Sequence, residues 1–479
     1  MAHGNRGPLR TLREAAAQRA VRGRLPLTIA LAGALVGGGL YLGNRAFVAA
    51  VTPTSCPAGC VTDGTLFVSS DQAMRDTEHE IAAANASATA GAYYSVVLLD
   101  PFTYSTSGTV SQSRMTDELQ GAYLALADAN ATVARKHTGV AIQLLLANEG
   151  TSAEEGESEA VQQIENLEGP DRIVAVAGMG LSTANTETAA NALSAVSMPM
   201  FGAVTTGDQF DLVNYPGFFQ VVPNVQDQVH SLVSHLGLTA PQPVALISSD
   251  QATDIYSIDL RVNFIGALGY LPPLKEFSYD PAMAEQQFAG FATTICTSQK
   301  KASSTSLTVL YAGREATLPT LVGQFQQASI CAGLTVTIVT GSDSNALPAS
   351  VTDRSDSPGA NVTVVYADIE SVARLSQDFV TGAPSPTSCL NQEYDPWEVA
   401  TYNSVRAAAF TVSRAASAAD SRTASPTGPL TAASVLSKAL DMVGTAPYPA
   451  PNGSFGFLSS GKLLNPAIPI YTDENGTCS

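Results

Sequence analysis

The chain has 479 residues, of which 45% are hydrophobic and 14% charged, enough apolar material for a substantial core and too much for a disordered protein. Two lobes of ordinary size fit this length better than one compact domain. The formal net charge is −18, although the first 26 residues contain six Arg and a single Glu. The remainder is therefore strongly acidic, which argues against nucleic acid as a partner because such a surface repels phosphates.

The N-terminal residues indicate a membrane anchor. Residues 1–24 form a basic tail, and the uncharged run at 25–44 would span ~30 Å as a helix, about one hydrocarbon core. The positive-inside rule places the basic tail in the cytoplasm and the bulk of the chain outside it, as a single-pass protein of the cell membrane. A cleaved signal peptide is the alternative, since Val48-Ala49-Ala50 offers a small-residue cleavage site. We expect residues 45–91 to form a spacer.

From residue 92 onward, short apolar strands alternate with amphipathic helices. Strands are predicted at 94–99, 140–146, 173–177, 198–203, 218–222, 244–248, 307–311, 335–339, 362–366 and 467–472. On the helix predicted at 255–268, Ile258, Val262, Ile265 and Leu268 share one face. This alternation predicts an α/β protein with two successive parallel sheets and right-handed crossovers.

We assign residues 92–220 plus 370–445 to a first lobe and 221–369 plus 446–479 to a second. The split C-terminal part reflects a long helix near Trp397 and a last strand, which we expect to return to the two lobes. In open α/β sheets, ligands bind beyond the carboxyl ends of the strands, so the turns that follow the strands are the candidate site.

The turns of the first lobe carry hydroxyls and glycines. The residues of this kind are Ser105, Ser107 and Gly108, then Gly180, Ser182 and Thr183, then Ala203, Thr205 and Thr206. Helix N-termini with free N–H groups and nearby hydroxyls bind carboxylates, although each of these hydroxyls could simply cap a helix. Three such turns together favour a binding pocket.

The matching turns of the second lobe carry charges and tyrosines. They contain Asp250, Asp254 and Tyr256, then Tyr311, Arg314 and Glu315, then Asp343. A carboxylate there would hold an ammonium group and a Tyr ring would flank the ligand, whereas each charge alone could equally be a solvated loop residue.

Motifs of catalysis are missing: the sequence has neither a GxSxG elbow nor a GxxxxGK[ST] phosphate loop, and we expect no enzyme and no cofactor. The six cysteines are Cys56, Cys60, Cys296, Cys331, Cys389 and Cys478. All follow the apolar run, where disulfides form. We favour the local pairs Cys56–Cys60 and Cys296–Cys331, which leaves Cys389 with Cys478. A zinc site is the alternative, but no paired CxxC or Cys/His cluster supports a metal.

In their order along the chain, several segments resemble one family, the type I periplasmic solute-binding proteins that bind branched-chain amino acids and serve ABC transporters. The segments are DELQGAYLALADAN (117–130), AVAGMGLSTANT, MPMFGAVTTGDQF, FFQVVPNVQDQV (218–229), VALISSDQATDIYS, LYAGREATLPTLVGQFQQASICAGL and NGSFGFLSSGK (452–462). The resemblance covers about four fifths of the chain, from Tyr94 to the end.

The resemblance implies two Rossmann-like lobes joined by crossover strands, here behind an N-terminal transmembrane helix. It implies a site in which Ser182, Thr183, Ala203 and Thr205 hold the ligand's carboxylate, while Tyr256, Tyr311 and Asp343 come from the second lobe. It also implies a function, the capture of a small polar, amino-acid-like or amide-like ligand by hinge closure and its delivery to an ABC permease. A sensing or interaction module with the same fold and no transport role is the alternative.

Overall fold

The computed structural model describes residues 56–64, 71–104, 110–136, 139–151, 156–238, 244–269, 275–344, 358–370, 395–422, 429–444, 447–451, 453–474 and 477–478. All of them belong to the unit Ser55–Ser479. The expected anchor at 25–44, the candidate site residue Ser107 and Cys389 lie outside these ranges. No helix within them is long and apolar enough to cross a membrane.

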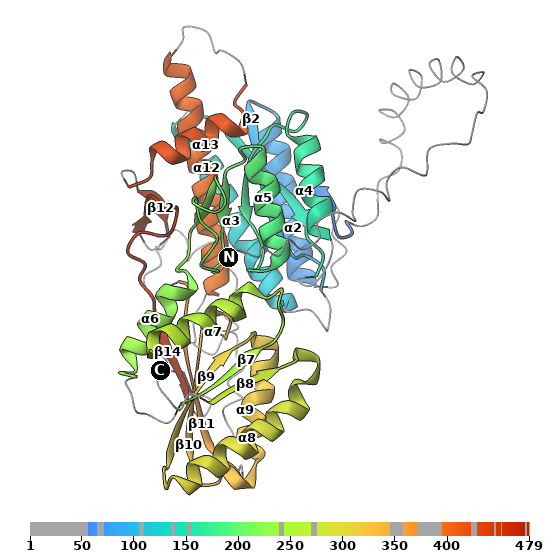
Figure 1. The fold of residues 1–479 in the computed structure, drawn as a ribbon. Coiled ribbons are helices and arrows are strands. Elements are labelled where there is room, and N and C mark those ends of the chain that lie inside the picture. The colour runs from blue at the N-terminus through green and yellow to red at the C-terminus, as the bar shows by residue number, and fades with distance from the viewer. Residues whose placement is uncertain are drawn as a thin grey trace, which may run out of the picture. The chain divides into compact units, whose positions relative to one another are not determined.

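Sheet one forms the core of the first lobe, with the strand order β1-β3-β2-β4-β5-β6. Its strands are β1 (Val61–Thr62), β2 (Tyr93–Asp100), β3 (Ala141–Asn148), β4 (Ile173–Gly178), β5 (Met200–Gly202) and β6 (Phe218–Gln220). All neighbours pair in parallel except β1, which runs antiparallel to β3. Helices α2 (Gln72–Thr89), α3 (Gln112–Lys136), α4 (Gly156–Leu167) and α5 (Ala184–Ala195) flank this sheet (Figure 1).

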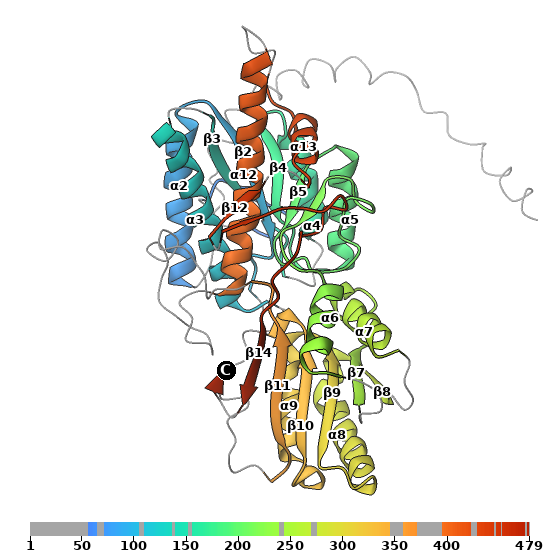
Figure 2. The ribbon, with the colours of Figure 1, turned by 90° about the vertical axis from the view of Figure 1, so that its left-hand side faces the viewer.

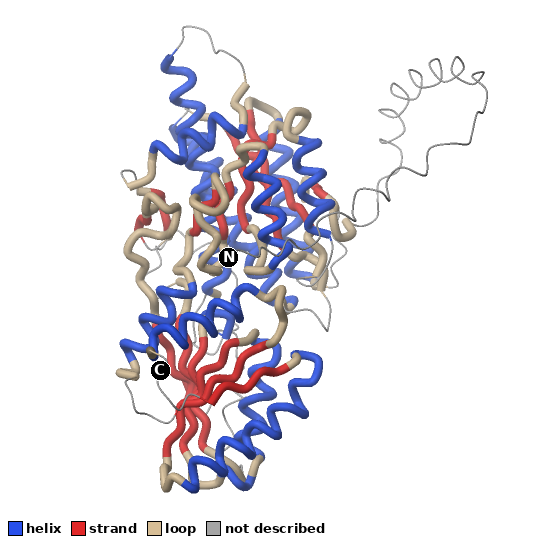
Figure 3. The backbone as a smooth tube through the Cα atoms, viewed as in Figure 1, coloured by secondary structure: helices blue, strands red, loops and turns tan. Residues whose placement is uncertain are grey.

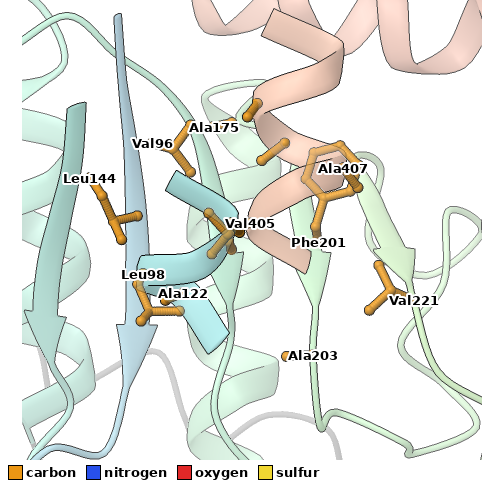
Figure 4. Close-up of a cluster of buried hydrophobic side chains, with 14 of the residues drawn as sticks. Val96, Leu98, Ala122, Leu144, Ala175, Phe201, Ala203, Val221, Val405 and Ala407 are labelled. Atoms are coloured by element: carbon orange, nitrogen blue, oxygen red, sulfur yellow. The ribbon is translucent and has the colours of Figure 1, made fainter. Parts of the chain in front are cut away.

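Both faces of sheet one are buried, which explains why its strands lack an alternating polar pattern. Along β2, Val96 and Leu98 face α2 and α3, whereas Val97 and Leu99 face α4 and α5. Figure 4 shows the first of these faces, where Val405 comes from a helix near the C-terminus. The sheet is therefore a central layer covered on both sides.

Two asparagine side chains close the outer edge of β3, where β1 is too short to pair with the whole strand. The amide of Asn85 on α2 accepts from Leu144 N (2.8 Å) and donates to Leu144 O (2.7 Å) and Asp63 O (2.9 Å). Asn130 on α3 makes the same pair of bonds to Ile142, at 2.8 and 2.9 Å. Each side chain thus replaces a neighbouring strand, since it satisfies an N–H and a C=O of one residue.

The expected spacer at 45–91 differs from the structure, because its second half belongs to the first lobe. Helix α2 buries Met74 and Ile81 against sheet one. Residues before it also join the sheet edge, with Gly59 N donating to Asn148 O (2.7 Å) and Asn148 N to Cys60 O (2.9 Å). The sequence indicates a possible helix at 72–84, but its polar, Ala-rich composition does not show that one narrow face of this helix packs onto the first lobe.

Sheet two forms the core of the second lobe, in the order β15-β14-β11-β10-β9-β7-β8. Its strands are β7 (Val244–Ser249), β8 (Lys275–Tyr279), β9 (Ser306–Ala312), β10 (Thr335–Thr340), β11 (Asn361–Ala367), β14 (Ile470–Glu474) and β15 (Thr477–Cys478). The first five are parallel and the last two antiparallel. The strands twist relative to one another (Figure 3). The sequence patterns predict all of these except β8 and β15, and β8 is an edge strand with polar, exposed residues.

Helices α6 (Val225–His235) and α7 (Ile255–Leu268) cover one face of sheet two, and α8 (Ala284–Lys301) and α9 (Leu318–Gln327) cover the other (Figure 2). The predicted apolar face of α7 is right only in part, because Leu268 is buried and Ile265 packs against the core. Ile258 and Val262 are exposed by 39% and 54%, while Tyr256, Leu260 and Phe264 are buried instead. The helix is apolar nearly all round, so spacing alone could not select the packed side.

The C-terminal elements return mainly to the first lobe. Helix α12 (Pro396–Arg422) packs against α3 and sheet one, and α13 (Ala432–Asp441) contributes Val435 to the same core. The hydroxyl of Ser404 on α12 accepts from Gly178 N (3.0 Å) and donates to Phe201 O (2.5 Å). It therefore joins the ends of β4 and β5.

The assignment of 446–479 to the second lobe fits only its last part, because β12 (Tyr448–Ala450) and β13 (Gly453–Phe455) adjoin the first-lobe core. Tyr448 and Phe457 are fully buried there, in an aromatic cluster with Phe201. The chain passes into sheet two only at β14.

Two disulfides lie within the described residues, Cys56–Cys60 and Cys296–Cys331, which are the two local pairs that the sequence favours. Cys331, in the short helix η4 (Ser329–Cys331), is tied to α8 across a sequence separation of 35. The third predicted pair, Cys389 with Cys478, stays a prediction because Cys389 lies outside the described residues.

Replacing both Cys296 and Cys331 with Ser is expected to lower the free energy of unfolding by about 4 kcal/mol, because the bond closes a long loop in the unfolded chain. The double Ser variant at Cys56 and Cys60 is the matched control. Its loop spans only four residues, and the expected loss is about 2 kcal/mol. Denaturant titration of both variants measures the difference, and equal losses would contradict the loop argument.

Candidate ligand-binding site

The two predicted turns of the first lobe lie side by side at the ends of β4 and β5. The backbone has positive φ at Gly178 (84°), Met179 (69°) and Gly180 (55°), which turns the chain sharply into α5. The hydroxyl of Ser182 accepts from Gly207 N (2.8 Å) and so links the first turn to the second. Thr183 caps α5 by accepting from Thr186 N at 3.3 Å, the role weighed for it as an alternative to ligand binding.

Ala203 and Thr205 have other partners than those expected of ligand-binding donors. Ala203 N donates to Gly178 O (2.8 Å), and the Thr205 hydroxyl donates to Gly180 O (2.9 Å). Both residues are fully buried. Their donors therefore hold the two turns together. Within the described residues, the hydroxyl proton of Ser182 has no acceptor, whereas its oxygen accepts from Gly207 N.

In the second lobe, the turns that follow β7 and β10 bring Tyr256 and Asp343 into contact. Tyr256 lies in the first turn of α7, and its hydroxyl accepts from Asp343 N at 3.1 Å. Asp343, in η5 (Ser342–Ser344) after β10, also accepts from Glu315 N at 3.0 Å through Oδ2. Burial raises the pKa of the Tyr256 hydroxyl, as does the nearby Asp343 carboxylate, so the phenol stays protonated.

Tyr311 lies on the other face of sheet two and does not flank these groups. Its hydroxyl is fully buried, donates to Arg314 O (2.9 Å) and contacts the Tyr279 hydroxyl (2.8 Å) and Thr317 Oγ1 (2.5 Å). Tyr311 therefore supports the backbone of the turn that follows β9. The expected role as a ligand wall does not fit this position.

Arg314 is the centre of the second-lobe turns. Its Nε and Nη2 donate to Asp254 Oδ1 at 3.0 and 2.7 Å, and its Nη1 is 3.8 Å from Asp343 Oδ1. The guanidinium lies 4.7 Å from the centroid of the Tyr256 ring. Burial lowers the pKa of Arg314, but the two carboxylates raise it by more, so the side chain stays charged.

Several hydrogen bonds connect the turns of the two lobes. Ser182 O accepts from Arg314 Nη2 (3.1 Å) and from Tyr256 N (3.3 Å), and Ala184 N donates to Thr253 O (3.0 Å). The predicted residues Ser182 and Tyr256 are thus brought together across the two lobes.

A second connection, not predicted from the sequence, involves Arg114 at the start of α3. Its Nη1 donates to Asp395 (2.9 Å), its Nη2 is 3.6 Å from Glu315, and its guanidinium lies 4.3 Å from the Trp397 ring centroid. Burial raises the pKa of Glu315 to about 7, although Arg114 acts in the opposite direction. In the sequence, Arg114 is a single arginine at the start of a predicted helix, and no motif indicates its contacts.

The first lobe also contains a set of buried carboxyl groups, of which Asp117 and Glu118 interact with Arg114. Burial raises the pKa of Asp117 and Glu149 to about 8 each and that of Glu398 to about 9, and it raises those of Asp100, Glu118 and Glu157 as well. Within the described residues, neither oxygen of Glu118 has a hydrogen-bond partner. No group of three or more His, Cys, Asp or Glu in that part of the chain is arranged to hold a metal ion.

The fold is that of the type I periplasmic binding proteins, as predicted. The chain is similar to a substrate-binding protein of an ABC transporter from Desulfitobacterium hafniense, solved in complex with Leu, with a TM-score of 0.56, 15% identity and coverage of 81% of this chain and 99% of that one. It is also similar to a leucine-binding protein from Thermotoga maritima (TM-score 0.54, 13% identity, 81% and 97% coverage).

A third similar structure is the solute-binding protein of an ABC transporter from Rhodopseudomonas palustris in complex with 3,4-dihydroxybenzoic acid (TM-score 0.51, 14% identity, 80% and 93% coverage). No family model matches the sequence, and no curated protein matches it. At these identities, the similarity defines the fold.

Proposed function

We propose that this protein is a non-catalytic solute-binding protein, anchored in the cell membrane with its bulk outside the cytoplasm, that captures a small polar ligand and delivers it to an ABC permease. The fold supports this proposal, because structurally similar proteins are substrate-binding proteins of ABC transporters and two of them hold Leu and 3,4-dihydroxybenzoic acid. Amino-acid-like and amide-like compounds are the ligand classes to test first.

The observation that carries the proposal is the meeting of Ser182 from the first lobe with Tyr256 and Arg314 from the second. A ligand at this junction would contact both lobes at once. Such a ligand stabilises the arrangement in which both sets of contacts form, and this is how hinge closure becomes dependent on ligand.

The membrane anchor in this proposal rests on the apolar run 25–44 and the six preceding arginines. The proposal of a permease as partner is supported only by the similarity of the fold to substrate-binding proteins of ABC transporters. Genes for a permease and an ATPase beside the gene for this protein would support transport.

The test is a thermal-shift screen of the full-length chain against amino acids, amides, purines, sugars and aromatic carboxylates. A ligand at 100 times its Kd is expected to stabilise the folded state by about 2.7 kcal/mol. The full chain is needed because α2 and the Cys56–Cys60 segment form part of the first lobe.

Ser182→Ala is expected to abolish the ligand's stabilising effect, since it removes the hydroxyl that retains a proton at the junction. Ser87→Ala, on the exposed side of α2, is the matched control and should retain it. A screen in which no class of small polar compound raises the Tm would refute the solute-binding proposal.

A sensing or interaction module remains the second candidate, and one observation favours it. The donors of Ala203 and Thr205 and the carbonyl of Ser182 already have partners within the protein. A junction held by internal bonds suits a module whose lobes report a change of contacts. Ligand binding in the screen combined with the absence of permease genes would favour this role.

A further inference from the structure

Asp254, Asp343 and Tyr256 form a subsite whose chemistry is that of a cation-binding box. The two carboxylates and the face of the Tyr256 ring surround one position, which the guanidinium of Arg314 occupies. Carboxylate oxygens attract a cation by charge, and the face of an aromatic ring attracts it through its quadrupole. All three side chains are buried, so solvent screens these attractions little.

The box lies at the carboxyl ends of three neighbouring strands of sheet two. Asp254 follows β7, Arg314 follows β9 and Asp343 follows β10, and β9 lies between the other two. Arg314 therefore extends from the middle one of the three strands, between Asp254 on one side and Asp343 on the other. The carboxyl edge of an open parallel sheet is also where such folds bind their ligands.

The side chain of Arg314 is held in this place from several sides. Asp254, which caps α7, accepts two hydrogen bonds from the Arg314 side chain. The Tyr311 hydroxyl donates to Arg314 O and so fixes the backbone of the same residue. The remaining Nη2 bond to Ser182 O reaches the first lobe. The guanidinium thus makes the contacts that a ligand's ammonium would need in order to join the two lobes.

We propose that Arg314 is an internal occupant of this box and excludes ligands that carry an ammonium group. The inference rests on the proposed function, and it narrows the ligand to a compound whose polar groups are uncharged or anionic, such as a carboxylate or an amide. For a second cation about 4 Å away, repulsion by the guanidinium alone corresponds to on the order of a thousandfold in binding, and the guanidinium also fills the position between the two carboxylates.

The test removes the internal cation and supplies one from solution. In the full-length chain, Arg314→Ala leaves Asp254 and Asp343 facing a space once filled by the guanidinium. Millimolar methylguanidinium is expected to raise the Tm of this variant by about 2–4 °C and to leave that of the wild type unchanged. Sodium chloride at equal ionic strength is the salt control.

Two further variants define the site of the effect. Arg261→Ala removes an arginine whose contact with Glu276 is far more exposed, and methylguanidinium should not rescue it. The double variant Arg314→Ala with Asp254→Asn removes the occupant of the box and one of its two carboxylates, so that only Asp343 remains charged. It should melt above the single variant and respond less to methylguanidinium.

A folded Arg314→Ala protein without any response to methylguanidinium would overturn the proposal, and so would an equal response of the wild type. If the single variant does not fold alone, recovery of folded protein on refolding with methylguanidinium replaces the Tm shift, and failure to recover it also counts against the proposal. Because methylguanidinium is not the transported solute, a screen without hits would refute the proposed function and leave this result intact.

Discussion

Replacing Asn85 with Ala is expected to lower the free energy of unfolding by roughly 2–4 kcal/mol. The change removes three hydrogen bonds and leaves the N–H and C=O of Leu144 without partners at a buried position. Denaturant titration of the full-length chain measures the loss. Hydrogen exchange at the Leu144 amide gives a local readout, since this amide should lose protection more than the amides of β4.

Ser87→Ala on the same helix is the control, because the Ser87 side chain is exposed and bonds only within α2. It should change the stability by less than about 0.5 kcal/mol. If Asn85→Ala proved equally neutral, the side chain would not serve as a substitute for a strand at this edge.

Stability is expected to fall as the pH rises from about 6 to 8.5. The carboxyl groups around Glu118 and Glu149 have raised pKa values in the folded state, so the folded chain binds more protons than the unfolded chain in this range. The free energy of unfolding then decreases with pH, by about 1.4 kcal/mol per pH unit for each group that is protonated only in the folded state. A single such group lowers the stability by about 2 kcal/mol between pH 6 and 7.5.

Melting curves of the full-length chain across this range test the sign. Glu118→Gln should flatten the profile, because it removes one buried ionisable group whose oxygens lack partners in the described part of the chain. Glu165→Gln makes the same substitution at an exposed position and should leave the slope unchanged. A stability that rises with pH would show that these carboxyls are ionised in the folded protein.

The general architecture follows from the sequence because parallel strands buried on both faces leave a clear pattern of apolar runs. Strands β2, β4 and β10 lie within one or two residues of their predicted positions. Edge strands leave a weaker pattern, and β8, with exposed Lys275 and Glu276, was not predicted at all. An edge strand pairs with only one other strand and buries fewer side chains, so its hydrophobic pattern is weaker.

The sequence predicts which strand ends come together, but it predicts fewer of the contacts that their side chains make. Ser182, Tyr256 and Asp343 lie at the junction because strand ends are set by the fold. The side chain of Tyr311 points to the opposite face of sheet two and so does not reach the junction. Successive residues of a strand face opposite sides, so an error of one residue in a predicted strand reverses the predicted face. The partners of Ala203 and Thr205 depend on backbone turns that side-chain identity does not reveal.

The packing of α12 onto sheet one has a consequence for how the chain folds during synthesis. Helix α12 and Tyr448 complete the core of the first lobe, yet they are translated after the whole parallel core of the second, which lies between Val225 and Ala367. The apolar faces of the first-lobe strands therefore stay uncovered until α12 has been synthesised, whereas the core of the second lobe can fold before that. Contacts this distant in sequence slow folding and prolong exposure to aggregation. The ribosome thus releases the second lobe's core for folding before the first lobe can be finished.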